Sequence, residues 1–334
     1  MLRSFLVLLL VLPLLAEPTP VRIAFWNIEN LFDTIDDPLK RDDDFTPNGR
    51  YEWTPERLNE KYQHLAQVIN DSENRPAILG LCEIENREVL ETLVTEYLDG
   101  RYAIVHRDSP DERGIDVALL HDRDFTVSYQ QWHTIPLPGN DRTREILEVH
   151  LKPKDQQRTT LVVFINHWPS RYGGQLESEP KRRLAASTLR QRVDQLLKSD
   201  PRSDIIIMGD FNDYPTDPSL KSVLQAVPLP ERPTDPTFPG KLFNTTWDLH
   251  AAEGQGTYMY RGTWGVLDQI IITAGLLDQR GFWWESGSTS PYRKDYILQQ
   301  QGKYAGWPWR MYAGGRYLGG YSDHLMIRCT LYYE

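Results

Sequence analysis

The chain has 334 residues, of which 40% are hydrophobic and 25% are charged, as in globular proteins and unlike disordered or fibrous ones. Its formal net charge of −10 provides no overall field that attracts nucleic acid, although a local patch or a metal can still hold a phosphate. The sequence has no Walker A loop, no Gly-x-Ser-x-Gly elbow, no Gly-x-Gly-x-x-Gly and no Cys/His cluster with zinc spacing, so these enzyme classes are unsupported.

The first 16 residues differ from the rest of the chain. Arg3 precedes an apolar run over residues 5–15, and the small Ala16 follows it. A positive start, a short apolar stretch and a small residue predict a signal peptide over 1–16 that is cleaved, and hence a secreted or periplasmic protein. The alternative is an uncleaved membrane anchor. Residues 20–334 show no linker, repeat or low-complexity tract, which predicts a single domain.

Ten short apolar runs, many rich in Val and Ile, predict β-strands. In chain order they are Val21–Trp26, Ala77–Cys82, Tyr102–His106, Ile115–His121, Phe125–His133, Glu145–Leu151, Thr160–Asn166, Asp204–Met208, Leu267–Ile272 and Leu325–Tyr332. Apolar residues at helical spacing predict three helices, one starting at Thr54-Pro55 and extending to Ile69, and two over Arg87–Leu98 and Leu184–Lys198. Many strands with few helices predict an α+β sandwich with helices outside two sheets.

Polar residues of the same chemical kinds adjoin six of these strands. They are Asn27 and Glu29, Glu83, Asn166 and His167, Asp210 and Asn212, Asp268, and Asp323 and His324. A single such residue is usually a turn residue or a solvated group, but six strand ends can converge on one rim of a sandwich. Oxygen ligands without soft donors suit Mg²⁺, Mn²⁺ or Ca²⁺. Histidine beside carboxylate suits proton transfer, or a charged imidazole that faces a phosphate.

The order of these motifs resembles that of the endonuclease/exonuclease/phosphatase superfamily, which includes DNase I, abasic-site endonucleases, inositol polyphosphate 5-phosphatases and neutral sphingomyelinases. The matching motifs are Trp26-Asn27, Leu-x-Glu ending at Glu83, Gly209-Asp210-Phe211-Asn212, Leu267-Asp268-Gln269-Ile270 and Ser322-Asp323-His324. The resemblance implies a four-layer αββα sandwich of the DNase I-like fold, with two mixed sheets packed face to face and the site at one rim. The longer strings over 29–33 and 109–116 resemble a bacterial secreted group, so the substrate stays open.

The resemblance also implies roles for individual residues. Asn27, Glu29, Glu83 and Asp323 match the metal side of the site, with Mg²⁺ as the expected ion and Mn²⁺ or Ca²⁺ as alternatives. His167 matches a residue near the phosphate, Asp210 the one that orients or deprotonates the attacking water, Asn212 the one that holds this water, and Asp268 the partner of the catalytic His324. Arg113 and Arg171 are weaker candidates for phosphate contacts, and solvated surface explains them equally well.

These roles predict metal-assisted hydrolysis of a phosphate ester, with a phosphodiesterase of the nuclease type as the preferred interpretation. A phosphatase or a phospholipase C-type, sphingomyelinase-like enzyme is the alternative. A non-catalytic surface module is a third interpretation, but it predicts losses among the matched side chains, and every matched position keeps a competent one. The expected partner is a phosphate-ester substrate, with nucleic acid as one candidate. No stable protein partner is implied, and a monomer is expected.

Three further features need an explanation. Residues 33–44 hold six aspartates, which indicate either a second cation site or, as we prefer, a solvated acidic loop. Residues 281–321 hold 11 aromatic residues, most of which we expect to pack over a sheet edge. If two or three stay exposed, they suit the bases of a single strand or a lipid interface. Cys82 and Cys329 lie at different distances from the rim, so we expect two free thiols.

Overall fold

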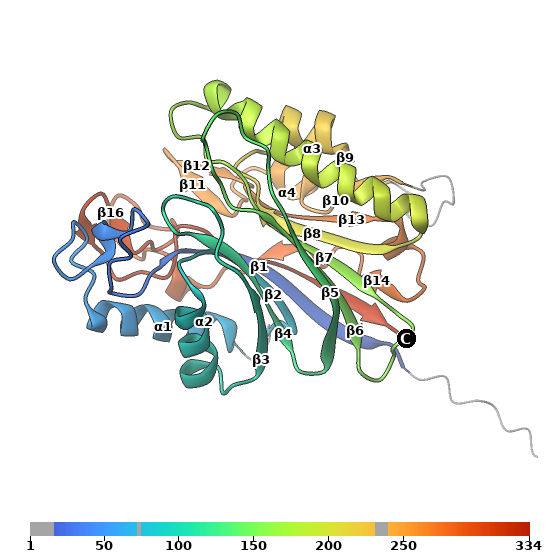
Figure 1. Ribbon diagram of the computed structural model, residues 1–334, viewed down its shortest axis with the longest axis horizontal. Helices are drawn as coiled ribbons and strands as arrows, with labels where there is room; N and C mark the ends of the chain where they lie inside the picture. The colour runs from blue at the N-terminus through green and yellow to red at the C-terminus, as the bar shows by residue number, and fades with distance from the viewer. Residues whose placement is uncertain (1–16, 72–74, 231–239) are drawn as a thin grey trace, which may run out of the picture.

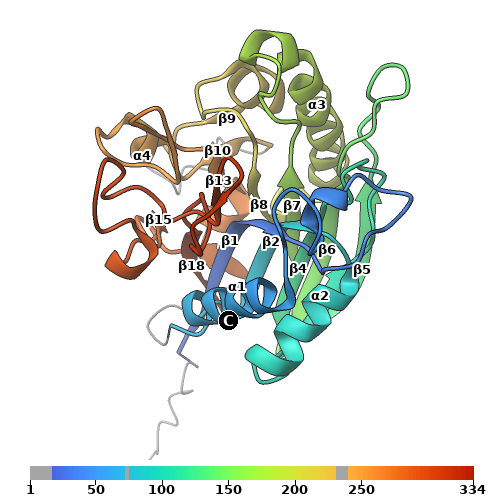
Figure 2. The ribbon, with the colours of Figure 1, turned by 90° about the vertical axis from the view of Figure 1, so that its left-hand side faces the viewer.

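The computed structural model describes residues 17–71, 75–230 and 240–334, so the predicted signal peptide lies outside the described residues. Within these ranges, the helices are too short or too polar to cross a membrane. Two large β-sheets lie face to face, with α-helices on their outer surfaces, as Figures 1 and 2 show. The predicted α+β, four-layer αββα sandwich is therefore confirmed.

The first sheet has the strand order β14-β18-β1-β2-β4-β3, and β15 also pairs with β18. Its strands are β14 (Phe282–Trp284), β18 (Ile327–Tyr333), β1 (Thr19–Leu31), β2 (Ile78–Ile84), β4 (Asp116–Asp122), β3 (Tyr102–His106) and β15 (Ser290–Pro291). β1 and β2 run parallel, whereas the other neighbours are antiparallel. The sheet is therefore mixed, as predicted.

The second sheet has the order β5-β6-β7-β8-β13-β10-β9. Its strands are β5 (Phe125–His133), β6 (Ile146–Pro153), β7 (Leu161–His167), β8 (Asp204–Asp210), β13 (Asp268–Thr273), β10 (Leu242–Asn244) and β9 (Ala226–Val227). The pairs β7–β8 and β9–β10 are parallel. Two small hairpins stand apart from both sheets, β11 (Tyr258–Tyr260) with β12 (Thr263–Gly265) and β16 (Tyr312–Ala313) with β17 (Arg316–Tyr317).

Alternation along the central strands builds the layers. In β1, Ile23 and Phe25 belong to the core between the two sheets, whereas Ala24 and Trp26 belong to the core beneath the helices of the first sheet. Both faces of the strand are thus buried, which explains its nearly continuous apolar sequence. β7 and β8 alternate in the same way between the central core and the core beneath the second sheet's helix.

Three main helices form the outer layers. They are α1 (Pro55–Ile69), α2 (Arg87–Thr92), which continues into a π-helical turn over Leu93–Tyr97, and α3 (Gln175–Ser199). α1 and α2 pack on the first sheet and α3 on the second. Shorter helical segments are η1 (Asp43–Phe45), η3 (Ser219–Leu224), α4 (Trp247–Ala251), η4 (Ala274–Leu277) and η5 (Asp295–Ile297).

All ten predicted strands are present, with small shifts at their ends. The Thr54 hydroxyl accepts a hydrogen bond from the Arg57 amide at 3.4 Å, and Pro55 opens α1 as predicted. The predicted start of α3 at Leu184 is wrong, because the helix begins at Gln175 and accommodates Pro180 within its second turn. Pro180 is the sixth residue of the helix and has no N–H to donate to the Leu176 carbonyl, so it removes one hydrogen bond of the ladder.

The prediction for the two thiols is confirmed. Cys82 pairs with Asn27 in the ladder between β1 and β2, whereas Cys329 pairs with Ile23 on the other side of β1. These two β1 positions are four residues apart, which separates the cysteines by about 13 Å along the strand direction. Both side chains are buried and unbridged.

The aromatic segment over 281–321 mostly packs against the first sheet and its helices. Trp283 stacks on Tyr332 of β18, and Tyr321 stacks on His64 of α1. Of its 11 aromatic residues only Tyr304 is exposed, with 44% of its surface accessible. The expected packing over a sheet edge is confirmed, and a row of exposed rings for stacking bases is absent from this described segment.

Candidate active site

The ends of five central strands meet at one rim of the sandwich. In the second sheet, Asp210 is the register partner of both His167 on β7 and Asp268 on β13. In the first sheet, Asn27 of β1 lies beside Cys82 of β2, directly before Glu83. β18 runs toward the C-terminus on the right of Figure 1, so the rim lies toward the left and faces the viewer in Figure 2.

The Asn27 side chain joins the two sheets at this rim. Its Nδ2 donates to Glu83 Oε1 at 3.2 Å and to Asp210 Oδ2 at 3.1 Å, while its Oδ1 accepts the Glu29 backbone N–H. The residue is 1% exposed. An amide suits this place because it donates to two carboxylates at once without adding charge. Asn27 thus fixes the spacing of the Glu83 and Asp210 carboxylates.

Backbone strain concentrates at the same rim. Four of the nine described non-glycine residues with positive φ lie here, namely Glu29 at 52°, Asn30 at 58°, Glu83 at 65° and Asn212 at 51°. Such conformations cost free energy and cluster where function requires a particular side-chain direction. The Asn30 backbone N–H also donates to Glu83 Oε2 at 3.1 Å, so the strained irregular end of β1, between Asn27 and Leu31, orients the Glu83 carboxylate.

Gly209 explains how β7 and β8 approach each other at the rim. A Cβ atom on Gly209 would lie 2.5 Å from both the Cβ and the carbonyl oxygen of Asn166. A larger residue would therefore push β8 away from β7 and separate Asp210 from His167. The glycine of the Gly-Asp-Phe-Asn motif consequently has a packing role beside the chemical residues that follow it.

Asp268 and His324 form a buried pair. Asp268 Oδ2 lies 2.7 Å from His324 Nδ1, and Asp268 is fully buried. Burial opposes the charge on the imidazole, but the Asp268 carboxylate outweighs it and raises the pKa of His324 well above its usual value. Nδ1 therefore carries a proton that faces Asp268, and the charged ring presents Nε2 to the site, 3.9 Å from Asp210 Oδ2. The sequence-based pairing of these two residues agrees with this geometry.

His167 lies beside Asp210 in a different electrostatic state. Its Nε2 is 3.7 Å from Asp210 Oδ2 and 3.9 Å from Glu83 Oε1, too far for direct hydrogen bonds. Burial, followed by the positive charges of Arg144 and Arg113, lowers the pKa of His167 well below its usual value. The rim thus holds one neutral and one protonated histidine on either side of Asp210.

Asp210 itself is buried between these groups. Its Oδ1 accepts the Asn212 backbone N–H at 2.9 Å. Burial is the main cause that raises the pKa of Asp210, the charge of His324 opposes the shift, and Asp268 adds to it. A carboxylate of increased basicity beside a fixed positive charge is suited to accept a proton from water. Asn212 points its own amide to the Trp168 carbonyl at 3.0 Å.

Glu29 is tied to the first helix and to the aromatic segment. Its carboxylate accepts the Met311 N–H at 2.7 Å and lies near the fully buried Lys61 ammonium, which donates to the Tyr321 carbonyl at 2.7 Å. Burial, with the neighbouring Asp323 charge, raises the pKa of Glu29 to about 8. The structure therefore gives Glu29 an anchoring contact, and its role as a metal ligand stays a prediction.

The two candidate phosphate contacts differ in their surroundings. Arg113 is half exposed, and its charge acts on both Glu83 and His167, so it borders the rim. Arg171 instead donates to the Asn212 carbonyl at 2.6 Å and pairs with Asp217 at 2.7 Å. Arg171 thus holds the loop after β8 in place, and its predicted phosphate contact remains untested.

Three further residues border the rim without belonging to any motif. Arg144 is buried and donates to Asp111 and to the Trp168 carbonyl. Arg310 lies 3.4 Å from Asp323 Oδ2, and the Tyr258 ring lies 4.6 Å from the His324 ring. Long-range folding, rather than a strand end, brings them here, so the strand-end pattern of the sequence did not indicate them.

The donor set at the rim fits a hard divalent cation. Asp210, Asp268 and His324 carry ligand atoms that lie within 4.8 Å of one another, but the charged hydrogen bond between Asp268 and His324 takes these two out of metal binding. Burial, followed by the neighbouring Asp323 charge, raises the pKa of Glu83. Crowded carboxylates that repel one another in this way are stabilised by a cation, and oxygen donors favour Mg²⁺, Mn²⁺ or Ca²⁺. Glu83 and Asp323, which are partly exposed, are the available oxygen ligands.

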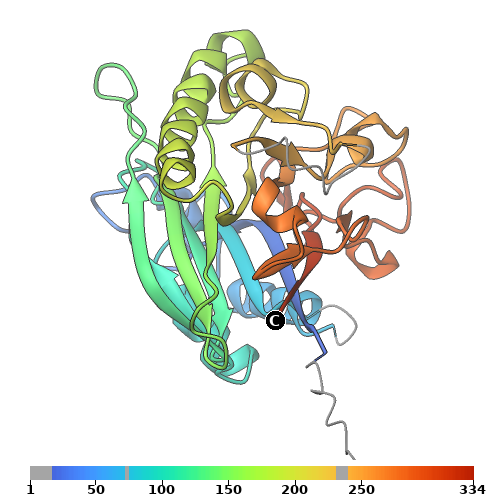
Figure 3. The ribbon, with the colours of Figure 1, turned by 90° about the vertical axis from the view of Figure 1, so that its right-hand side faces the viewer.

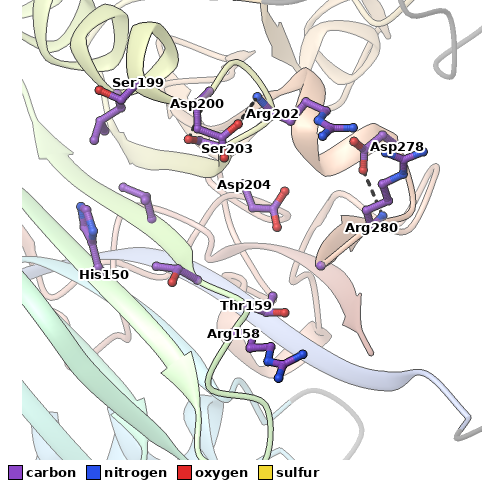
Figure 4. Close-up of a pocket in the computed structure, with 14 residues that line it drawn as sticks. His150, Arg158, Thr159, Ser199, Asp200, Arg202, Ser203, Asp204, Asp278 and Arg280 are labelled. Atoms are coloured by element: carbon purple, nitrogen blue, oxygen red, sulfur yellow. Dashed lines mark hydrogen bonds between the residues drawn. The ribbon is translucent and has the colours of Figure 1, made fainter.

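A cavity lies at the opposite end of the second sheet. It measures about 440 Å³ and is lined by Asp204, the first residue of β8, together with arginines and hydroxyl side chains, as Figure 4 shows. Figure 3 views the molecule from that end. Because Asp210 ends the same strand, the cavity and the rim are about 20 Å apart. The cavity therefore does not contain the rim residues.

Solved structures with the same architecture span nearly the whole chain. Truncated Caenorhabditis elegans TDP2 has a TM-score of 0.55 at 15% identity, covering 94% of this chain and 98% of that one. The Bacteroides thetaiotaomicron mannosyl-6-phosphatase Bt3783 has a TM-score of 0.56 at 17% identity, covering 93% and 99%. D. rerio TDP2 complexed with single-strand DNA product has a TM-score of 0.56 at 13% identity, covering 94% and 99%.

These low identities establish the fold alone. Curated protein sequences give no match. A family model for the endonuclease/exonuclease/phosphatase family, in contrast, matches residues 22–332, a range that begins within β1 and ends within β18 and so contains every strand end at the rim. The chain therefore belongs to the endonuclease/exonuclease/phosphatase family.

Proposed function

We propose that this protein is a divalent-metal-dependent phosphodiesterase that hydrolyses its substrate by direct attack of water. The observation that carries the proposal is the arrangement around Asp210. This carboxylate lies between a neutral His167 and a protonated His324, and Asn27 links it to Glu83. General base, positive charge and metal-side carboxylate are the three components that phosphoester hydrolysis requires.

Asp210 acts as the group that orients and deprotonates the attacking water. Its Oδ2 is 3.7 Å from His167 Nε2 and 3.9 Å from His324 Nε2. These distances are too long for direct hydrogen bonds, and a water or a phosphoryl oxygen beside the groups can contact Asp210 and a histidine nitrogen at once. The two hydrogen bonds from the Asn27 side chain and the Asn212 amide keep the carboxylate in place.

His324 offsets the negative charge that grows on the phosphoryl oxygens. Asp268 keeps its ring charged and orients it through Nδ1, so that Nε2 is free to donate to the substrate. His167 is neutral and buried, and it donates or accepts one hydrogen bond at the phosphate. Arg113, half exposed at the rim, adds positive charge where the phosphate enters. Fixed charges of this kind act strongly because burial excludes water.

Glu83 and Asp323 are the residues that we assign to the metal, with Mg²⁺ as the ion and Asn27 as the group that orients Glu83. A divalent cation held by these residues would supply polarisation of a non-bridging phosphoryl oxygen and neutralisation of the leaving oxygen. Glu29 is assigned to the metal side as a positioning residue, because its carboxylate is held by the Met311 amide. The protein is proposed to act outside the cytoplasm, as a monomer.

The proposal is tested by assaying the purified mature protein, with and without Mg²⁺, on single-strand DNA, RNA, phospholipid vesicles, the diester bis(p-nitrophenyl) phosphate and the monoester p-nitrophenyl phosphate. We expect hydrolysis of at least one diester that stops in EDTA and returns with Mg²⁺. The Asp210→Asn variant provides the control for contaminating enzyme. Wild-type activity that persists in EDTA contradicts the metal assignment. Hydrolysis of monoesters alone contradicts the phosphodiesterase assignment in favour of a phosphatase.

A further inference from the structure

The aspartate-rich loop after β1 is shaped by its own side chains, because three of its aspartates accept backbone N–H groups of the same loop. The pairs are Asp33 with Ile35 at 2.6 Å, Asp37 with Leu39 at 2.9 Å, and Asp42 with Asp37 at 3.0 Å. Short polar side chains favour such turns because they replace a backbone carbonyl as the acceptor. Asn86, the N-cap of α2, donates to the second Asp33 oxygen at 3.0 Å. The loop is therefore folded and anchored.

This loop directs Lys40 toward a second loop, over 109–114, which precedes β4. Lys40 Nζ donates to the carbonyls of Ser109 at 3.0 Å and of Asp111 at 3.1 Å. Its aliphatic stem passes Gly114, where a Cβ atom would lie 3.2 Å from Lys40 Cγ. Hydrogen bonds from a charged donor are stronger than those between neutral groups. One half-buried ammonium thus fixes the backbone of the second loop at two places.

The second loop carries Arg113, which borders the rim. The Arg113 backbone N–H donates to Asp111 Oδ1 at 3.0 Å, and its Nε lies 3.5 Å from the same oxygen. Asp111 is only 4% exposed. The Arg113 side chain is half exposed, and its charge acts on Glu83 and His167. A fixed backbone therefore presents a solvent-accessible guanidinium beside the rim, and Lys40 is one of the groups that fix it.

The neighbouring Arg41 shows how a cation of the same loop differs when it only offsets acidic charge. Arg41 pairs with Glu112, and the two side chains are 72% and 50% exposed, so this pair contributes little to stability. Lys40 donates instead to two carbonyl groups, which carry no net charge. Neutralisation of the acidic loop does not account for these contacts, whereas support of the second loop does.

We propose that Lys40 is a positioning residue of the active site, which holds the loop over 109–114 so that Arg113 meets the phosphate of the incoming substrate. The inference rests on the proposed function, because it takes Arg113 as a contact of that phosphate. A side chain that is ordered before binding loses less conformational freedom when the ligand arrives, so a fixed loop increases affinity. The aspartate-rich loop then has a function that a solvated acidic segment lacks, since it carries the cation that supports its neighbour.

The test is a double-mutant cycle between Lys40→Met and Arg113→Met, measured as the dissociation constant for inorganic phosphate in Mg²⁺ by titration calorimetry. We expect Arg113→Met to weaken phosphate binding by about tenfold or more, and Lys40→Met by about fivefold, because hydrogen bonds to charged groups are lost or misplaced. Once Arg113 is absent, Lys40→Met should weaken binding no further, since the loop then holds no guanidinium for the phosphate. Lys40→Arg, which keeps the charge and the donors, should retain most of the affinity.

Arg41→Met is the matched control, since it removes the same charge from the adjacent position of the same loop. We expect it to leave phosphate binding within about twofold of the wild type. In steady-state kinetics on bis(p-nitrophenyl) phosphate, Lys40→Met should raise KM and leave kcat within about twofold, because a contact made on entry is kept in the transition state. Hydrogen exchange of the amides over 109–114 should become faster in Lys40→Met and stay unchanged in Arg41→Met.

The proposal is overturned if the losses of affinity in Lys40→Met and Arg113→Met add in the double variant. It is also overturned if Arg41→Met weakens phosphate binding as much as Lys40→Met, because the charge of the loop then explains the effect. Unchanged hydrogen exchange in Lys40→Met excludes the support of the second loop. A wild type that binds phosphate but hydrolyses no diester contradicts the proposed function instead, and the binding cycle still decides the role of Lys40.

Discussion

The two ends of β8 provide a direct comparison within one strand. Asp204 opens the strand and Asp210 closes it. Each carboxylate accepts a backbone N–H at 2.9 Å, from Phe282 and Asn212 respectively, and burial raises the pKa of both. Only the Asp204 end opens into the 440 Å³ cavity. Cavity size and a perturbed carboxyl therefore do not distinguish a catalytic end from a structural one.

The difference lies in what the neighbouring strands contribute. At the Asp210 end, adjoining strands bring Asn27, His167 and the Asp268–His324 pair to one carboxylate. At the Asp204 end, the carboxylate anchors the start of β14 through the Phe282 amide. Exposed arginines line the cavity around it, as Figure 4 shows. Convergence of complementary groups, each fixed by a separate strand, marks the functional end.

The largest predicted loss of turnover follows from replacing the aspartate at one end of β8, and the same replacement at the other end should change turnover little. Asp210→Asn removes the base and leaves the volume unchanged, so we expect turnover to fall by about 10²–10³-fold with the fold intact. Asp204→Asn should leave turnover within about twofold of the wild type, because it lies outside the rim. Steady-state kinetics on one diester substrate, with circular dichroism as the folding control, measure both. Equal losses in the two variants would remove the catalytic assignment from Asp210.

The second prediction concerns the metal side of the rim. Glu83→Gln keeps one oxygen that can accept the hydrogen bond from Asn27 but removes the negative charge that attracts a cation. We expect the Mg²⁺ concentration at half-maximal activity to rise by about tenfold or more, with partial recovery of the rate at high Mg²⁺. A Mg²⁺ titration of activity measures the shift. An unchanged midpoint with a reduced maximal rate would assign Glu83 to proton transfer instead.

A smaller effect is expected in the pH profile. Asp268 raises the pKa of His324 well above its usual value, so the wild-type ring stays protonated through neutral pH. In Asp268→Asn this charge is absent, burial dominates, and the pKa of His324 falls. The activity that needs the protonated ring should then decline at a lower pH in Asp268→Asn than in the wild type. Activity at acidic pH is retained better. If the alkaline limb of the pH–rate profile stays in place in the variant, Asp268 is not what keeps His324 charged.

The sequence predicted the strands and the rim from local information. Val- and Ile-rich runs determine the strands, and polar residues directly after them determine which side chains reach the rim, so Asn27, Glu83, Asp210 and Asp268 were predictable. Arg144 was not, because its position depends on contacts with Asp111 and Trp168. Local patterns do not encode such long-range pairs.

The acidic loop illustrates the same limit. Six aspartates in twelve residues predict a solvated segment, and most of the loop is at least partly exposed. Asp42 is buried because η1 and the hydrophobic cluster around Trp53 fold the loop back against the end of β2, where it contacts Glu85. The short strands β9, β10 and β14 were missed for a related reason, since two or three residues are too few to show a period.

The smallest predicted effect is a change in the pH dependence of stability, and it concerns Asp204 at the structural end of β8. Burial raises the pKa of Asp204 to about 8, so between its ordinary value near 3.8 and pH 8 the folded state holds a proton that the unfolded state has released. Stability therefore falls as pH rises through this window. Asp204→Asn removes the titration, and its melting temperature should decline less between pH 5 and 8 than that of the wild type. Parallel pH profiles for the two proteins would show that Asp204 is already ionised in the folded state, held by the arginines of the cavity, and that the two ends of β8 differ in charge as well as in chemistry.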